Sequence, residues 1–421
     1  MTSDRGSPVW HPFTQHALQP EATMIARGAG AVLETPDGRR IIDAISSWWV
    51  VTHGHRHPTI VEAIHRQIDI LDQVIFAGFT HEPAEELAAR LIQLAPAGLA
   101  HVFYSDSGST AVEVAIKMAL GYWHNTGGKR HRILALEHAY HGDTVGAMSA
   151  GARGVFTEAY APLLFEVVRV PFPSADDAQS TLDAIEAACA AGDVAALLVE
   201  PLILGAGGMR IYSAETLAEM VRVARHHGAL VIADEVMTGW GRTGALFAST
   251  QAGITPDILC TAKGLTGGSI PLAATLATAA IFDAHVSSDR RRTFFHSSSY
   301  TANPIACAAG LANCNVWREE PVMERIDLLQ TAQEAHIAPF RDDADFANVR
   351  RIGTITALDL VVPDNGYLAE IGPKLYAFFA NRDVLLRPLG NTIYVMPPYC
   401  IEDDDLDHIY RTIRDAADAC I

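Results

Sequence analysis

The chain has 421 residues, 49% of them hydrophobic, which predicts a large buried core and excludes a disordered protein. Its formal net charge of −18, from 49 acidic and 31 basic side chains, argues against a general nucleic-acid binder. No apolar run reaches the ~18 residues of a membrane span, and the N-terminus MTSDRGSPVWHPF lacks a basic segment followed by an apolar one, so a cytoplasmic location is expected.

The first elements are a hairpin and a histidine-rich turn. In GAGAVLETPDGRRIIDA the triplet DGR lies between two apolar runs, which predicts a hairpin. THGHRHP then places His53, His55 and His57 at alternate positions, as on one face of an extended strand. No carboxylate or cysteine stands beside them, and the six cysteines form no C-x-x-C pair. No metal site and no disulfide framework are therefore expected.

The middle of the chain alternates apolar runs with amphipathic stretches. The runs are HVFYSDSG, RILALEHAYHG, VAALLVEPL, ALVIADEV, PDILCTAKG and IPLAATLAT. Between two of them, SAETLAEMVRVARHHG begins with Ser213 as a helix cap and stops at Gly228. Strands that are apolar throughout and joined by helices predict an α/β fold with a mostly parallel sheet covered on both faces.

The chain turns helical from about Asn313, then gives RIGTITALDLVV, a strand in NTIYVMPPYCI and an acidic closing helix. These elements and the N-terminal hairpin predict a smaller α+β domain built from both ends of the chain. We therefore expect residues 1–54 and 313–421 to form the small domain and residues 55–312 to form the large one.

A hydroxyl-rich helix start lies in SDSGSTAVEVAIKMAL. Free amides of Gly108, Ser109 and Thr110 at this start favour a phosphate site, although a plain helix cap explains the same residues. The Gly-Lys-Ser/Thr ending of a Walker loop is missing. Glu113 and Lys117 have the spacing of a pair on the exposed side of the helix.

Two further strand ends carry side chains suited to a flat ligand. Tyr140 in EHAYHGDT follows a strand, where its ring can cover one face of a cofactor, or can simply pack in the core. Glu200 in VEPLILGAGGM ends a strand beside a glycine run, where it can accept a hydrogen bond from a ring substituent, or serve as a loop or helix-cap carboxylate.

The most informative pair is Asp234 in ADEVMTGWGRTG and Lys263 in CTAKGLTGGSIPL. GALVIADEV is apolar on both faces, and a buried carboxylate is rarely tolerated unpaired, so Asp234 needs a cationic partner. A protonated pyridine nitrogen is one, and Lys263 after the next strand can form an imine. This combination predicts a pyridoxal 5'-phosphate enzyme in which Asp234 keeps the ring an electron sink and Lys263 transfers the proton.

The ordered set SDSGS, HAYHGD, VEP, ADEVMTGWGRTG, AKGLTGG and ANPIACAA resembles the class III (ω-type) aminotransferases of the pyridoxal-phosphate fold type I superfamily. WHPFTQH, ISSWWVVTHGHRHP and RPLGNTIYVMPPY narrow the resemblance to one branch of that family. The resemblance implies an enzyme that transfers an amino group from S-adenosylmethionine to 8-amino-7-oxononanoate, giving 7,8-diaminononanoate in biotin biosynthesis.

The resemblance also implies roles for individual residues. Gly108 and Ser109 are expected to bind the cofactor phosphate, Tyr140 to stack on the ring, Asp234 to pair with its nitrogen and Lys263 to form the imine. The catalytic set implied is Lys263, Asp234 and Tyr140, and the cofactor-binding set is Gly108, Ser109, Tyr140, Glu200, Asp234, Lys263, Ser298 and Ser299.

The implied substrate site uses aromatic and basic side chains from both ends of the chain. Arg387 is expected to receive a substrate carboxylate, since a guanidinium fork suits that geometry. Core packing for Trp48 and a surface ion pair for Arg387 are the alternatives. The implied substrate-binding set is Phe13, Trp48, Tyr140, Lys263, Ser297, Arg387 and Tyr394, with Asp143 close to Tyr140.

Two positions depart from the common pattern of the family. Ser297, Ser298 and Ser299 in FFHSSSYTANP stand where relatives often carry glycine, a variable residue and threonine. Ser299 keeps the hydroxyl that reaches phosphate, and the resemblance implies that it does so across a homodimer with shared sites. Phe13 stands where several relatives have a tyrosine that touches substrate, so one substrate hydrogen bond is in question.

Other functions fit parts of the same pattern. The nearest is another class III enzyme with lysine or an ω-amino acid as donor, although Trp48, Trp49 and Tyr394 favour the S-adenosylmethionine branch. A nicotinamide-dependent dehydrogenase would explain the alternating strands and helices, but G-x-G-x-x-G is missing after the first strand. A non-catalytic binding protein would not need Lys263 and Asp234 together.

Overall fold

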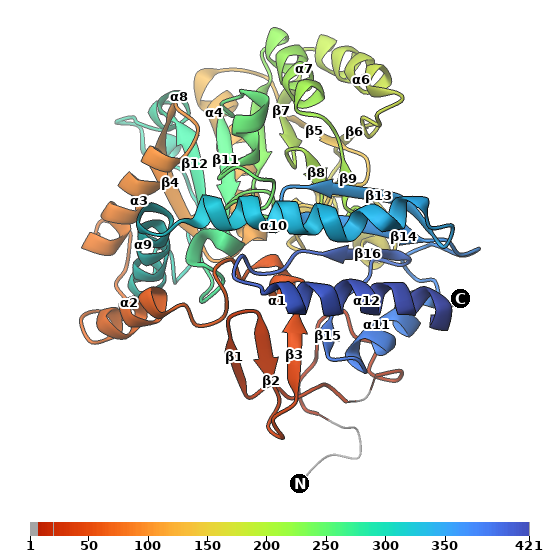
Figure 1. Cartoon of the computed structure of the whole chain (residues 1–421). Helices are drawn as coiled ribbons and strands as arrows, with labels where there is room; N and C mark the ends of the chain where they lie inside the picture. The colour runs from red at the N-terminus through yellow and green to blue at the C-terminus, as the bar shows by residue number, and fades with distance from the viewer. Residues whose placement is uncertain (1–6, 20, 421) are drawn as a thin grey trace.

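The computed structural model describes residues 7–19 and 21–420. Its centre is a seven-stranded sheet with the order β4-β12-β11-β10-β7-β5-β6, in which β12 alone runs antiparallel to its neighbours (Figure 1). All six apolar runs that were predicted as strands in the middle of the chain lie in this sheet, whereas the short edge strand β6 was not predicted. The strands are β4 (Leu99–Ser105), β5 (Arg132–Leu136), β6 (Val168–Val170), β7 (Val194–Val199), β10 (Leu230–Asp234), β11 (Ile258–Thr261) and β12 (Ala273–Thr278).

Helices cover this sheet and connect its strands, as the apolar character of β7 and β10 on both faces requires. The predicted cap at Ser213 is confirmed, because its side chain accepts a hydrogen bond from the Thr216 amide. The helices of this part are α2 (Pro58–Ile68), α3 (Glu82–Leu94), α4 (Gly108–Thr126), α5 (Val145–Ala150), α6 (Ala178–Ala190), α7 (Ala214–His226), α8 (Ala279–Asp283) and α9 (Pro304–Glu319).

The two ends of the chain share a second sheet with the order β1-β2-β3-β15. The predicted hairpin is confirmed as β2 and β3, which pair antiparallel around the DGR turn. A separate three-stranded sheet has the order β13-β14-β16. Bounds are β1 (Arg27–Ala29), β2 (Val32–Glu34), β3 (Arg40–Asp43), β13 (Phe346–Ile352), β14 (Ile355–Leu360), β15 (Val384–Leu385), β16 (Thr392–Val395), α1 (Ser46–Trp49), α10 (Val322–Ile337), α11 (Ile371–Ala380) and α12 (Asp403–Cys420).

The remaining short elements lie in the connections. They are the pair β8 (Ile203–Leu204) and β9 (Arg210–Ile211), and the 3-10 turns η1 (Glu158–Leu163), η2 (Ala248–Ala252), η3 (Lys263–Thr266), η4 (Arg290–Arg292) and η5 (Ala338–Asp342). The predicted boundary between residues 312 and 313 falls inside α9, so helix formation begins earlier than expected; the division into two domains stays a prediction. None of the helices in the described ranges is both long and apolar enough to cross a membrane.

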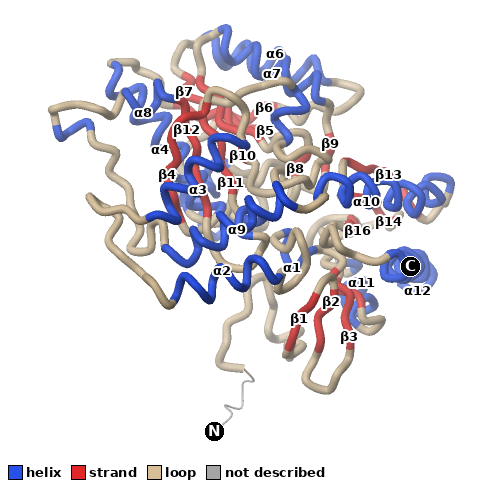
Figure 2. The backbone as a smooth tube through the Cα atoms, turned by 60° about the vertical axis from the view of Figure 1, so that its left-hand side comes forward, coloured by secondary structure: helices blue, strands red, loops and turns tan. Residues whose placement is uncertain are grey.

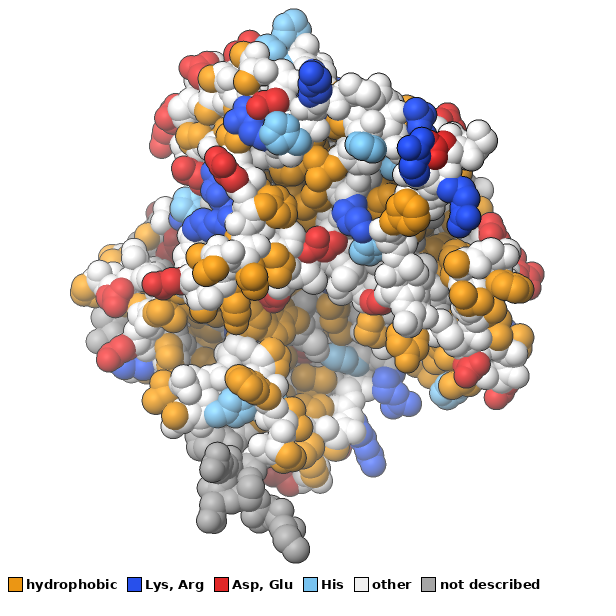
Figure 3. Space-filling view, turned by 180° about the vertical axis from the view of Figure 1, so that it is seen from behind, with side chains coloured by type: hydrophobic (Ala, Val, Ile, Leu, Met, Phe, Trp, Pro, Cys, Tyr) orange, Lys and Arg blue, Asp and Glu red, His pale blue; other side chains and the backbone are white. Residues whose placement is uncertain are grey.

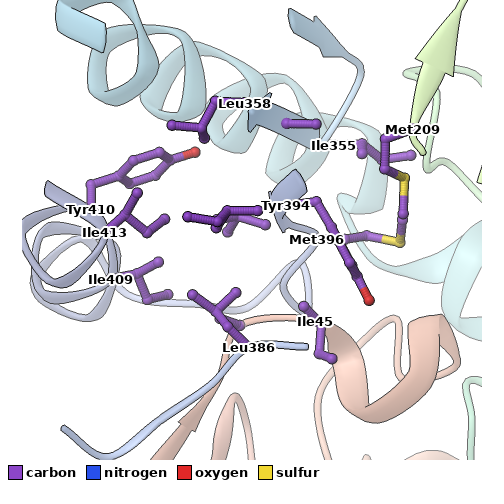
Figure 4. Packing of buried hydrophobic residues seen from close by; sticks show 14 of the residues in the cluster. Ile45, Met209, Ile355, Leu358, Leu386, Tyr394, Met396, Ile409, Tyr410 and Ile413 are labelled. Atoms are coloured by element: carbon purple, nitrogen blue, oxygen red, sulfur yellow. The ribbon is translucent and has the colours of Figure 1, made fainter. Parts of the chain in front are cut away.

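The core between α10, β14, β16 and α12 brings the N-terminal residues to the C-terminal strands. Figure 4 shows Ile45 of the N-terminal part beside Met396 and Tyr394, with Ile409 and Tyr410 of α12 on the far side. All of these side chains are buried. Figure 2 shows α1 close to the end of β16, so this core fixes where α1 meets the large sheet.

Candidate active site

A cavity of about 630 Å³ lies where β4, β5, β7, β10 and β11 end. The carboxyl ends of parallel strands meet at one edge of a sheet, and this edge is where ligands bind in open α/β folds. The volume is within the range of small-molecule sites. Six of the eight residues in the predicted cofactor-binding set line it, namely Gly108, Ser109, Tyr140, Glu200, Asp234 and Lys263, and so do Asp143 and Trp49.

The start of α4 differs in part from the predicted phosphate site. Ser107 is the N-cap, and its hydroxyl accepts a hydrogen bond from the Thr110 amide at 3.2 Å. The amide of Thr110 is therefore already paired, while those of Gly108 and Ser109 start the helix at the cavity wall. The Ser109 hydroxyl is held by Thr144, whose amide donates to its oxygen at 2.9 Å.

The predicted pair between Glu113 and Lys117 is wrong. Glu113 Oε1 instead accepts hydrogen bonds from Thr144 Oγ1 at 2.6 Å and from the Gly146 amide at 2.7 Å. Lys117 donates to the Phe295 carbonyl at 2.7 Å. Glu113 thereby accepts the hydrogen bonds of amides in the first turn of α5, since the N-cap residue Thr144 makes no side-chain cap bond there.

Lys263 begins the η3 turn with a positive φ of 43°, which side chains rarely adopt. Burial lowers the pKa of Lys263 to about 8, although the carboxylates of Asp234 and Glu200 oppose that shift. Its Nζ lies 4.6 Å from the centre of the Trp49 ring. The lysine is therefore an amine in reach of the cavity with a pKa near neutral.

Asp234 ends β10 and is buried, as predicted, and its carboxylate already has hydrogen-bond partners within the chain. His141 Nδ1 lies 2.7 Å from Asp234 Oδ2, and the Val236 amide donates to Oδ1 at 3.1 Å. The chain itself therefore supplies one partner of Asp234, and the pairing of Asp234 with a cofactor nitrogen stays a prediction. His141 was missed, although the motif HAYHGD that drew attention to Tyr140 contains it.

Glu200 behaves as the loop carboxylate of the alternative interpretation. Its oxygens accept hydrogen bonds from the Tyr140 amide at 2.9 Å and the Gly205 amide at 3.0 Å. Burial raises the pKa of Glu200 to about 7, and nearby His141 opposes the shift. Burial and the neighbouring Asp143 carboxylate raise the pKa of Tyr140. Glu200 therefore fixes the backbone that carries Tyr140.

The aromatic residues predicted for the substrate site divide into two groups. Trp49 lines the cavity, and its indole nitrogen donates to the Tyr394 hydroxyl at 3.1 Å, so Tyr394 lies behind Trp49. Trp48 is not among the residues that line the cavity, and the Arg387 guanidinium lies 5.1 Å from its ring centre. Phe13 packs edge-on against Trp48, and its carbonyl accepts a hydrogen bond from Arg387 at 3.0 Å.

The three serines of FFHSSSYTANP lie apart from this cavity in the single chain. The Ser297 hydroxyl donates to the Ser298 carbonyl, and the Ser298 amide donates to Thr301. Gln73 donates to the Ser299 carbonyl at 2.7 Å, which joins this segment to the loop after α2. The resemblance implies that Ser299 reaches phosphate across a homodimer, and the cofactor-binding roles of Ser298 and Ser299 stay predictions.

Comparison with known proteins supports the motifs. The family model described as aminotransferase class-III matches residues 14–417. Adenosylmethionine-8-amino-7-oxononanoate aminotransferase of Synechococcus elongatus is 48% identical, over 97% of this chain and 98% of that protein. The protein of the same name from Nitratidesulfovibrio vulgaris is 41% identical, over 97% of this chain and 80% of its own length.

Solved structures agree over almost the whole length. The adenosylmethionine-8-amino-7-oxononanoate aminotransferase from Methanocaldococcus jannaschii has a TM-score of 0.93 and 31% identity, covering 98% of this chain and 97% of its own. An amine transaminase from an uncultivated Pseudomonas species, in its PLP-bound form, has a TM-score of 0.92 and 32% identity, covering 99% of both chains. These matches confirm the predicted fold type, and the chain belongs to the class III aminotransferase family.

Proposed function

We propose that this chain is a pyridoxal-phosphate-dependent aminotransferase that moves an amino group from S-adenosylmethionine to 8-amino-7-oxononanoate, giving 7,8-diaminononanoate for biotin biosynthesis. The observation that carries the proposal is one cavity that joins Lys263, with its lowered pKa, to the buried Asp234. The names of the similar proteins support the choice of substrates.

The residues present fit the cofactor. The cavity has a buried carboxylate in Asp234, an amine in Lys263, an aromatic ring in Tyr140 and the helix start at Gly108. When bound, pyridoxal 5'-phosphate supplies a carbonyl that condenses with amines and a ring that takes up the electron pair of a substrate carbanion. The amides of Gly108 and Ser109 would hold its phosphate, and Asp234 would hold its ring nitrogen protonated.

Lys263 acts as nucleophile and then as base. A pKa of about 8 leaves roughly one lysine in ten neutral at pH 7, far more than for an unperturbed lysine. The neutral amine of Lys263 would hold the cofactor through its carbonyl, and when free its Nζ would take up and return a proton at the reacting carbon atoms. Glu200 holds the backbone of Tyr140 at the sheet edge, where the Tyr140 ring would cover one face of the cofactor.

Arg387 is the proposed carboxylate receptor for both substrates. Its guanidinium stacks on Trp48 and donates one hydrogen bond to the Phe13 carbonyl, which leaves further N–H groups for a forked contact. The Phe13 ring makes no phenolic hydrogen bond, so Phe13 contributes apolar surface and a carbonyl. Trp48 and Trp49 offer flat surfaces to the long non-reacting parts of the two substrates.

We expect S-adenosylmethionine to remove the absorption band of the bound cofactor in the purified enzyme. Lysine and alanine should leave that band unchanged. Subsequent 8-amino-7-oxononanoate should restore the band and release 7,8-diaminononanoate, as rapid-mixing spectroscopy and mass spectrometry would record. Arg387→Ala is the matched control for carboxylate recognition and should weaken both steps. Conversion by lysine or alanine at the rate seen with S-adenosylmethionine would instead support the alternative below.

The alternative is another class III ω-aminotransferase. The structural match to an amine transaminase at 32% identity over 99% of both chains favours it as the second candidate. The same experiment separates the two functions, because only the donor differs. A cytoplasmic location is part of the main proposal, and cell fractionation with antibodies to the chain would test it.

A homodimer with shared sites is also part of the proposal. Hydrophobic and charged side chains mix over the face in Figure 3. A group of large hydrophobic side chains is exposed in two segments, residues 68–79 and residues 295–300. The bond from Gln73 to Ser299 brings its two halves together. A patch of this kind marks an interaction surface, and a second copy of the chain would cover it. Its members are Ile68, Ile70, Ile75, Phe79, Phe295 and Tyr300.

Mixing Lys263→Ala with Ser299→Asp subunits should restore activity, because a heterodimer has one site with both parental residues. Random exchange puts about a quarter of all sites in that state. The control mixes Lys263→Ala with Asp234→Asn, two changes within one subunit's cavity, and should restore nothing. Absence of recovery in the first mixture, with subunit exchange demonstrated by native mass spectrometry, would rule out shared sites.

A further inference from the structure

The histidines of THGHRHP bind three different partners. His53 Nε2 lies 3.0 Å from Asn313 Oδ1, His55 Nε2 lies 2.8 Å from Asp43 Oδ2, and His57 Nε2 lies 3.1 Å from Glu320 Oε1. The segment is not the extended strand that the alternation suggested, because Gly54 and Arg56 have positive φ values of 94° and 58°, and the three rings reach separate elements of the fold. Two of these partners lead to the cavity of the active site, from opposite sides.

The bond from His55 leads to the corner at residues 46–49. Ser46, Ser47 and Trp49 have φ values of 53°, 61° and 67°, a left-handed conformation that is strained for residues other than glycine. Asp43 is fully buried and holds this corner, because it accepts hydrogen bonds from the Ser47 amide at 2.6 Å and the Ser47 hydroxyl at 2.9 Å. His55 is the third donor to Asp43 and fixes the carboxylate itself.

The strained corner turns two adjacent tryptophans toward two different cations. The Trp49 ring lies over Lys263 Nζ at 4.6 Å, and the Trp48 ring lies beside the Arg387 guanidinium at 5.1 Å. Both distances are within the reach of a cation–π interaction. The backbone of the corner sets the direction in which each tryptophan leaves the chain, so the positions of both rings depend on it.

The bond from His53 leads to the turn that carries Lys263. Asn313 is fully buried, and its Nδ2 donates to the carbonyls of Gly264 at 3.0 Å and Leu265 at 3.1 Å. Its Oδ1 is therefore an acceptor, so the hydrogen of the His53 ring is on Nε2. Burial lowers the pKa of His53 to about 3, which keeps this ring neutral. His53 thus fixes Asn313, and Asn313 fixes η3.

The corner and the turn also touch directly. A side chain at Gly268 would place its Cβ 2.5 Å from the Val50 carbonyl, and φ at Gly268 is 84°, so glycine is required here. The chain just after Trp49 therefore packs against the chain just after Lys263. Neither of them can shift far without moving the other.

We propose that His53 and His55 are positioning residues, which fix Lys263 and Trp49 against each other through Asn313 and Asp43. The inference rests on the proposed function, in which Lys263 carries the cofactor. Trp49 presents the negative face of its ring to the cationic nitrogen on Lys263, and this contact favours the protonated form of that nitrogen. Loss of either anchor loosens the contact.

The test uses three matched variants of the cofactor-loaded enzyme, His53→Phe, His55→Phe and His57→Phe. The readout is the pH at the midpoint of the transition of the bound cofactor's absorption band. We expect this midpoint to fall by about half a pH unit to one pH unit in the first two variants, because the protonated form loses a cation–π contact. His57→Phe keeps a ring beside His53 and should leave the midpoint unchanged.

Two further comparisons separate positioning from a general loss of structure. His53→Gln and His55→Gln keep a donor and should return the midpoint toward the parental value. In a Trp49→Leu background, His55→Phe should cause no further shift, since the contact it positions is gone. If a phenylalanine variant does not fold, Asn313→Ser and Asp43→Ser interrupt the same two connections and should lower the midpoint alike.

Parental midpoints in both His53→Phe and His55→Phe would overturn the inference, and so would an equal shift in His57→Phe or full additivity with Trp49→Leu. These results leave the proposed function intact. A parental protein without a bound-cofactor band would refute the proposed function, and the inference with it.

Discussion

Lys263→Ala abolishes amino transfer while the chain keeps its fold. Lys263 is the lysine of the cavity, and alanine supplies neither the attacking amine nor the proton carrier. The substitution removes a partly buried cation that costs free energy to bury, so the melting temperature should not fall. The variant should bind the cofactor without a covalent bond.

Borohydride reduction of the parental enzyme, followed by peptide mapping, measures the attachment directly. The label should be on Lys263, and the Lys263→Ala variant should release its cofactor on gel filtration. Lys117, on the outer side of α4 and bound to the Phe295 carbonyl, offers the control Lys117→Ala, which should retain the label. A label on any other lysine would reject the assignment.

Asp234→Asn keeps the cofactor but loses several orders of magnitude in the rate of both half-reactions. A neutral amide does not hold a ring nitrogen protonated, so the carbanion loses the charge that stabilises it. His141 continues to find an oxygen acceptor at residue 234, which preserves the local packing. The substitution therefore removes the negative charge of residue 234 and keeps the local structure.

Single-turnover rates at saturating substrate test this expectation. Glu235→Gln is the matched control, since Glu235 is the next residue, is equally buried and binds Ser249 and Thr238 instead of facing the cavity. Its rate per folded molecule should stay near the parental one. A rate for Asp234→Asn within tenfold of the parent, about 1.4 kcal/mol in the barrier, would mean that Asp234 has a different role.

The sequence predicted the sheet because its strands are apolar on both faces and end in polar residues. Asp234 and Lys263 were found for the same reason: a charged side chain directly after such a run is conspicuous. The short edge strand β6 carries too few residues for a periodic signal. The predicted start of α9 is too late, because ANPIACAA was assigned to a family motif and its residues were not counted as part of a helix.

Contacts between segments that are far apart in the chain could not be predicted from the sequence. The i,i+4 spacing of Glu113 and Lys117 predicted a surface pair, but Gly146 lets the first turn of α5 approach Glu113, where a Cβ would lie 2.1 Å from its Oε2. His141 and Asp234 are 93 residues apart, and their bond depends on the order of the strands. Trp49, and not Trp48, meets Lys263 because three residues of the corner have positive φ.

The contacts between the two ends of the chain set an order of events during synthesis. Ser46 binds the Met396 carbonyl and Trp49 binds Tyr394 across 350 and 345 residues of sequence, and Ile42 of β3 pairs with Val384 of β15. A ribosome that has released the large sheet, with Asp234 and Lys263 in place, has not yet made the strands that hold Trp49. The lysine side of the site therefore matures first, and the aromatic side closes over it only after the last strands emerge.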